Sequence, residues 1–148
     1  MEHCVKTLEK LGVPHDVRIL SAHRTPEALT SYMVEAEEGG VEVFIGAAGG
    51  AAHLAGVMAA QTARPVLAIP MESKLLGIDS LLSMVQMPAG IPVATFAVGK
   101  AGAINAALFS AAILAPGHME IGEALNTFRR AQSEKVLADP DPRQPPPG

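Results

Sequence analysis

The chain has 148 residues, a formal net charge of −4 at pH 7, and 49% apolar residues, which suits one domain with a core and excludes a disordered chain. The absence of a basic block argues against nucleic-acid binding, and the single cysteine, Cys4, excludes an intrachain disulfide and a metal–thiolate cluster. No apolar run is long enough for a bilayer and the first residues are too charged for a signal peptide, so we expect a cytoplasmic protein without membrane contact.

Hydrophobic periodicity and turn residues predict alternating helices and strands along the chain. In order, we expect helix 2–11, strand 15–20, helix 26–38, strand 41–46, helix 49–61, strand 65–70, helix 77–86, strand 91–99, helix 100–115 and helix 119–138. Thr25 is expected to cap the second helix and Pro26 to open it. This alternation is typical of an α/β domain, here 1–138, with a parallel sheet covered by helices on both faces. The Pro-rich tail 139–148 is expected to be disordered.

Three segments that follow predicted strands collect glycine and polar residues: SAHRTP, GAAGGAAHLAG and PMESKLLGIDS. In parallel sheets, ligands bind at the carboxyl ends of the strands. These three loops are therefore the candidate site.

The first loop combines Ser21, His23 and Arg24. Imidazole is suited to proton transfer near neutral pH, and guanidinium binds phosphate or carboxylate through a fork of donors. The alternatives are that His23 only caps backbone groups and that Arg24 forms a surface salt bridge.

The Gly-rich loop offers close backbone approach and the start of a helix, which together can hold an anion. It lacks the dinucleotide-binding spacing, and its glycines could equally serve helix packing. His53 lies about one turn into the predicted helix, where a histidine is usually structural. No His or Glu spacing predicts a metal site. Glu72 and Asp79 could form a carboxylate pair, although their spacing is unspecific.

The segment 100–115 is apolar nearly all round, so a helix there would be buried on every side. We expect it to lie at subunit contacts in a homo-oligomer. The alternative is a central helix in a monomer.

Four motifs, SAHRTP, AGGAAHL, DSLLSMVQMPAGIPVAT and GKAGAINAAL, together resemble the PurE family in order and spacing. HRTP resembles the class I members, the 5-(carboxyamino)imidazole ribonucleotide mutases of purine biosynthesis. The resemblance implies a three-layer αβα fold with a flavodoxin-like parallel sheet, a homo-octamer, and a reaction without metal or organic cofactor.

That reaction moves a carboxylate from an exocyclic nitrogen to carbon 4 of the same aminoimidazole ring, by decarboxylation and recarboxylation. The resemblance implies that His23 is the catalytic acid and base, and that Ser21 and Arg24 bind the ribose phosphate. It implies that the carboxylate and carbon dioxide lie against the remaining matched residues, Ala48, Gly49, Gly50, His53 and Leu54.

Family members begin with a strand and a Gly-Ser-x-Ser-Asp motif that have no counterpart in this sequence. We therefore expect the first strand of the fold to be missing, and poor folding or weak substrate binding. Ala47 also stands where the family commonly has glycine. Two alternatives to the mutase are direct carboxylation of aminoimidazole ribonucleotide and a catalytically impaired PurE-like oligomer.

Overall fold

The computed structural model of the chain describes residues 1–138 and 143, so the expectation for the tail falls mostly outside them. The elements are α1 Glu2–Lys10, α2 Pro26–Glu38, β1 Phe44–Ala48, α3 Leu54–Ala59, β2 Val66–Pro70, α4 Ile78–Val85, β3 Ala94–Thr95, α5 Lys100–Leu114 and α6 Met119–Ala138. The strands form a parallel sheet in the order β1-β2-β3. The predicted α/β class is confirmed.

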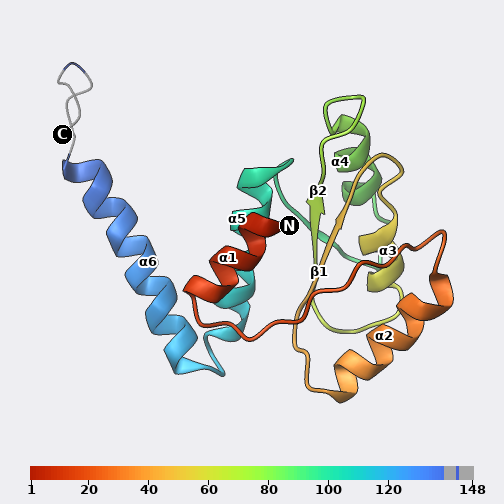
Figure 1. Ribbon diagram of the computed structural model, residues 1–148, viewed down its shortest axis with the longest axis horizontal. Helices are drawn as coiled ribbons and strands as arrows, with labels where there is room; N and C mark the ends of the chain where they lie inside the picture. The colour runs from red at the N-terminus through yellow and green to blue at the C-terminus, as the bar shows by residue number, and fades with distance from the viewer. Residues whose placement is uncertain (139–142, 144–148) are drawn as a thin grey trace.

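The sheet lies between two helical layers (Figure 1), with α1, α5 and α6 on one side and α2, α3 and α4 on the other. The central strand β2 shows why helices must pack against both faces of the sheet. Leu67 and Ile69 point into the core beneath α1 and α5, whereas Val66 and Ala68 point into the core beneath α2, α3 and α4. A strand buried on both faces reads as a continuous apolar run, which is why β2 was evident in the sequence.

The strand predicted at 15–20 is wrong: these residues form no β-ladder. Their alternation of polar and apolar side chains is that of a strand, but a strand also needs a neighbour for its N–H and C=O groups. No backbone–backbone hydrogen bond of residues 14–20 occurs within the described residues.

Two other elements are shorter than expected. The strand predicted at 91–99 is regular only at Ala94–Thr95, although Phe96 and Gly99 still donate to the carbonyls of Ala68 and Pro70. The helix predicted at 49–61 covers only Leu54–Ala59. The preceding residues form a loop closed by short-range hydrogen bonds, from Ala52 N to Gly50 O and from His53 N to Ala51 O.

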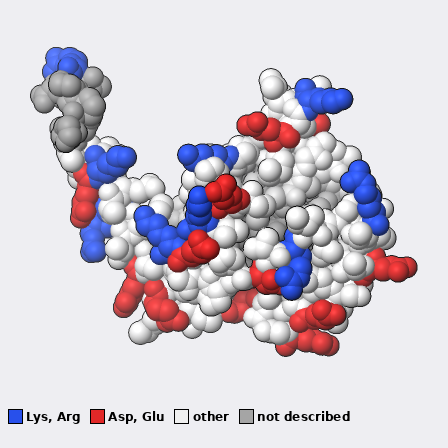
Figure 2. Space-filling view, in the orientation of Figure 1, with Lys and Arg blue, Asp and Glu red and all other residues white. Residues whose placement is uncertain are grey.

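Helix α5 is buried on one side rather than all round. Its small residues Gly102, Ala103, Ala106 and Ala107 face α1 and the sheet, while the Phe109 side chain is 47% exposed. In the described part of the chain, none of the helices has the length and apolarity to cross a membrane. Lysine, arginine and acidic residues are interspersed on the face shown in Figure 2.

Candidate active site

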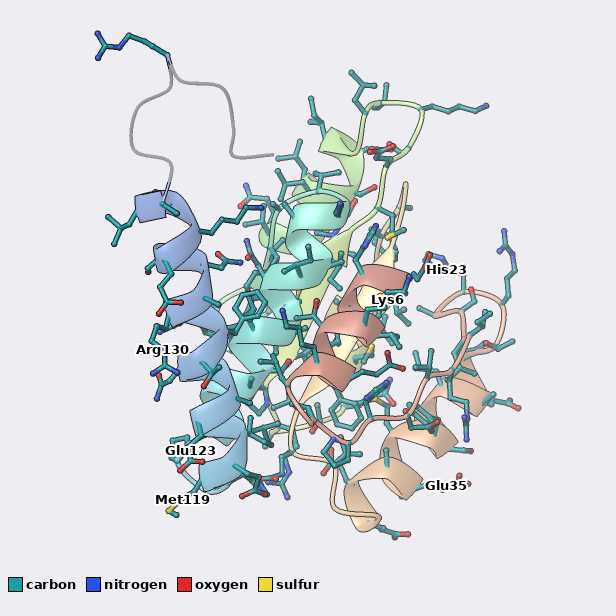
Figure 3. The ribbon with its side chains drawn as sticks, turned by 60° about the vertical axis from the view of Figure 1, so that its left-hand side comes forward. Lys6, His23, Glu35, Met119, Glu123 and Arg130 are labelled. Atoms are coloured by element: carbon teal, nitrogen blue, oxygen red, sulfur yellow. The ribbon has the colours of Figure 1, made fainter. Side chains whose placement is uncertain are left out.

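The candidate loops lie together at the carboxyl-end edge of the sheet. Residues 21–25 lead into α2, residues 49–53 connect β1 to α3, and residues 71–77 connect β2 to α4. Figure 3 shows His23 on the side of the molecule away from α6, whose Met119, Glu123 and Arg130 are labelled. The sheet thus brings together loops that are far apart in the sequence.

Two imidazoles meet at this edge of the sheet. His23 Nε2 lies 2.9 Å from His53 Nδ1, and the ring planes are inclined by 75° with centroids 5.0 Å apart. Both side chains are exposed. His53 is the residue preceding α3, so its predicted place one turn inside a helix is wrong. Because the helix starts late, the His53 ring reaches toward the loop that carries His23.

The SAHRTP loop is a turn closed by its own side chains. The Ser21 N–H donates to Thr25 Oγ1 at 2.8 Å, the Thr25 hydroxyl donates to Ser21 O at 3.1 Å, and the Arg24 N–H donates to Ser21 Oγ at 3.2 Å. Thr25 is the N-cap residue of α2, as predicted, but its side chain closes the turn and makes no capping hydrogen bond.

The Arg24 guanidinium is exposed and forms no ion pair with any described residue. The surface salt bridge that the sequence left open for Arg24 is therefore absent from residues 1–138 and 143. Its charge is available to an anion from solvent.

The Gly-rich loop is held from beneath by α4. Gly50 has φ +70°, a conformation that glycine adopts without strain, and its N–H donates to the Ser80 hydroxyl at 2.9 Å. Ser80 is fully buried, and Ser83 Oγ donates to Gly50 O at 3.4 Å. The Gly50 N–H is thus used within the protein rather than offered to a ligand.

Ser80 is a site residue that the sequence reasoning missed. Its signal was a serine on the buried face of an amphipathic helix, four residues before the buried Met84. A buried hydroxyl needs a hydrogen-bond partner, but the sequence does not show that this partner lies in the Gly-rich loop.

The remaining predicted residues border the same loop. Ala48 O accepts a hydrogen bond from Met71 N at 2.8 Å, and a Cβ on Gly49 would lie 3.4 Å from Met71 Cβ. Leu54, half-buried, begins α3. Ala47 packs toward α1 and α5.

The carboxylates of the third loop do not pair with each other. Asp79 accepts a hydrogen bond from the Ser73 hydroxyl, which also accepts from the Gly77 N–H. Glu72 instead lies beside Gly99, after β3. In the described part of the chain, no group of three or more His, Cys, Asp or Glu side chains could hold a metal ion.

In proteins with a parallel sheet between two helical layers, ligands bind at the loops that follow the carboxyl ends of the strands. This arrangement therefore defines a class of ligand-binding proteins and enzymes. The chain belongs to the AIR carboxylase family, whose model matches residues 1–135. The resemblance to PurE is thereby confirmed.

Similar proteins of known name support the same family assignment. The chain is 58% identical to the N5-carboxyaminoimidazole ribonucleotide mutase of Pseudomonas aeruginosa, covering 97% of this chain and 88% of the relative. It is 54% identical to the mutase of the same name from Escherichia coli K12, covering 97% and 85%. The crystal structure of Treponema denticola PurE is similar, with a TM-score of 0.83 at 26% identity, over 93% of this chain and 85% of that one. The expected αβα fold is confirmed.

Proposed function

We propose that the chain is an isomerase of purine biosynthesis, which converts 5-(carboxyamino)imidazole ribonucleotide to 4-carboxy-5-aminoimidazole ribonucleotide. Relatives at 58% and 54% identity that carry this mutase name support the reaction. The structural observation that supports it best is the His23–His53 pair beside the Gly-rich loop.

The chemistry requires two proton transfers, one to the exocyclic nitrogen and one from ring carbon 4. The bond between the exocyclic nitrogen and the carboxylate carbon breaks, carbon dioxide is released, and the nitrogen gains a proton. Ring carbon 4 then attacks the carbon dioxide, and the proton on carbon 4 must be removed. His23 serves as the acid in the first step and as the base in the second, since a neutral imidazole and its protonated form interconvert near pH 7.

The other predicted residues hold the substrate. Arg24 and Ser21 bind the ribose phosphate, and this role is supported by the Arg24 guanidinium, which forms no ion pair within residues 1–138 and 143. The small residues Ala48, Gly49 and Gly50, with His53 and Leu54, enclose the carboxylate and the carbon dioxide. Small side chains around the site leave room for carbon dioxide and little room for water that would compete with it.

The decisive experiment compares two substrates on the purified chain. A mutase turns over 5-(carboxyamino)imidazole ribonucleotide without added bicarbonate, whereas a direct carboxylase needs aminoimidazole ribonucleotide and carbon dioxide. Turnover only with the second pair would replace the mutase by the carboxylase. Turnover with neither would favour the impaired oligomer.

The variant His23→Asn tests the acid–base role of His23. Its control is His3→Asn, on the exposed surface of α1. Loss of a general acid–base costs about 10²- to 10⁴-fold in kcat. Equal kcat for His23→Asn and the control would remove His23 from its role.

The assembly that we propose is a cytoplasmic homo-octamer. Large apolar side chains that remain exposed on α4, on the loop before it and on α5 support association: Leu75, Leu76, Ile78, Leu82, Val85 and Phe109. Light scattering after size-exclusion chromatography gives the mass, and a monomer at micromolar concentration would contradict the proposal. Cell fractionation tests the location.

A further inference from the structure

Two imidazole nitrogens from different loops face each other at the candidate site. His23 Nε2 and His53 Nδ1 are 2.9 Å apart, and the ring planes are inclined by 75°, so the rings meet at an edge and do not stack. Neutral imidazole nitrogens are the commonest metal ligands in proteins, through either Nε2 or Nδ1. The contact therefore brings two ligand atoms of the same kind to one place.

The spacing of the two nitrogens is close to that of two ligands on one zinc ion. Zn–N bonds of about 2.0–2.1 Å in a tetrahedral site place two nitrogens roughly 3.3 Å apart. The pair would therefore have to open by about 0.4 Å to admit the ion. Both side chains are exposed, so this opening needs no movement of the core.

Both rings can take the tautomer that a metal ion requires. The ion binds a nitrogen lone pair, so the proton that now lies between the two nitrogens must move to the other nitrogen of its ring. Those other nitrogens are His23 Nδ1 and His53 Nε2, and neither has a hydrogen-bond partner within residues 1–138 and 143. Each ring keeps one proton, so two neutral rings bind the ion without releasing a proton.

The surroundings of the pair favour a reversibly bound ion over a resident one. Two protein ligands leave two positions for water, and no third His, Cys, Asp or Glu completes the set among the described residues. Resident sites also hold the second nitrogen of each histidine by a hydrogen bond, which the described part of the chain does not supply. Imidazole suits zinc, copper and nickel, whereas Mg²⁺ and Ca²⁺ prefer oxygen ligands.

We propose that His23 and His53 form an inhibitory site for a divalent transition-metal ion, with Zn²⁺ as the ion that it takes. Once His23 Nε2 holds the ion and Nδ1 holds the proton, this ring has no lone pair left to remove the proton from ring carbon 4. The inhibition rests on the acid–base role proposed for His23, whereas the binding rests only on the two nitrogens.

Isothermal titration calorimetry with zinc chloride measures the binding, on the full chain without a histidine tag and in a buffer that does not bind metals. One Zn²⁺ per chain should bind at this pair, and Mg²⁺ should give no heat. Zinc affinity should fall by about 100-fold or more in His23→Asn and in His53→Asn, because even the loss of an outer partner of a metal ligand costs about 10- to 100-fold.

Two further variants serve as matched controls. His3→Asn removes an exposed histidine of α1, and His118→Asn removes the histidine whose Nε2 lies 2.6 Å from Glu42 Oε1, the other close pair that an ion could enter. Zinc affinity should be unchanged in both. A loss in His118→Asn, with none in His23→Asn or His53→Asn, would assign the ion to the other pair and overturn the proposal.

Turnover of 5-(carboxyamino)imidazole ribonucleotide, measured with excess chelator and then with saturating Zn²⁺, separates this inference from the proposed function. Zn²⁺ should lower kcat by about 10²- to 10⁴-fold, the cost of losing a general acid–base, and the chelator should restore it. Zinc binding at the pair without turnover in chelator would reject the proposed function but support the metal site. No zinc binding at millimolar concentration, equal zinc affinity in all four variants, or turnover undiminished by saturating Zn²⁺ would each overturn the proposal.

Discussion

His23 Nε2 and His53 Nδ1 share a hydrogen bond of 2.9 Å between residues thirty positions apart, so one ring must donate while the other accepts. This contact couples the tautomer of His23 to that of His53. The orientation of the proposed acid–base group therefore depends on a residue of the Gly-rich loop.

His53→Phe should keep a ring in place but remove the partner nitrogen. We expect kcat to fall by about 10- to 100-fold, because a misoriented acid–base group loses its alignment with the substrate. His53→Asn restores a polar atom near the position of Nδ1 and should recover part of the loss. The pH profile of kcat should also change in His53→Phe, whereas a purely structural role would leave that profile unchanged.

Arg24→Ala should mainly weaken substrate binding. Its guanidinium has no partner in the described chain, so its removal costs the fold little. A charge-assisted contact to phosphate is worth about 1.5 to 3 kcal/mol, which corresponds to a rise in KM of roughly 10- to 100-fold. Steady-state kinetics at fixed ionic strength measure this change, and an unchanged KM would contradict the phosphate role.

Ser80→Ala should loosen the Gly-rich loop. The variant leaves the Gly50 N–H without its buried acceptor, at a cost of about 1 to 3 kcal/mol in the free energy of unfolding. Denaturant unfolding measures the loss, and Ser80→Thr, which keeps the hydroxyl, shows how much of it belongs to the hydrogen bond. A loss of stability in Ser80→Thr as large as in Ser80→Ala would assign the effect to packing.

Gly102→Ala should destabilise the junction between β3 and α5. A Cβ on Gly102 would overlap the backbone carbonyl of Ala97, so one of the two segments must move. Overpacking of this kind costs about 1 to 3 kcal/mol. Gly122→Ala in α6 is the control, because its Cβ would meet Ala115 Cβ at an ordinary 3.4 Å. The control should be neutral or gain stability through helix propensity, and equal melting temperatures for the two variants would refute the clash.

Cys4 should make the protein less stable in alkali. Burial raises the pKa of its thiol above the ordinary value of 9.0, so the unfolded chain loses this proton at lower pH than the folded chain. The free energy of unfolding should therefore decline as pH rises above about 9. Urea unfolding at a series of pH values measures the slope, and Cys4→Ala should show a smaller decline between pH 9 and 10. Identical slopes would show that the thiol does not contribute.

The sequence predicted best those helices and strands whose own side chains indicate which of their faces are buried. β2 is apolar on both faces, and α5 carries small residues where it meets α1, so both were found with nearly correct limits. The segment 15–20 has an equally clear alternation, yet it forms no strand. Side-chain alternation reports which faces are buried, whereas a ladder depends on a neighbour that the segment itself cannot reveal.

The sequence indicated which loops could form the candidate site, but not the contacts between them. The loops that hold His23, Arg24 and Gly50 were recognised, but the contacts of Gly50 with Ser80 and of His23 with His53 were not. Both join residues thirty positions apart, and no local pattern encodes such pairs. The late start of α3 has a different, local origin, because short-range hydrogen bonds in the Gly-rich loop compete with the first helical turn.

The self-closed turn at Ser21–Thr25 has a consequence for the order of folding. Its bonds join residues at most four apart, so closing it costs little loop entropy. The link between Gly50 and Ser80 spans thirty residues and must await the assembly of β1, β2 and α4. The turn that carries His23 is thus expected to form early and locally, and the His53 side of the pair to arrive with the sheet.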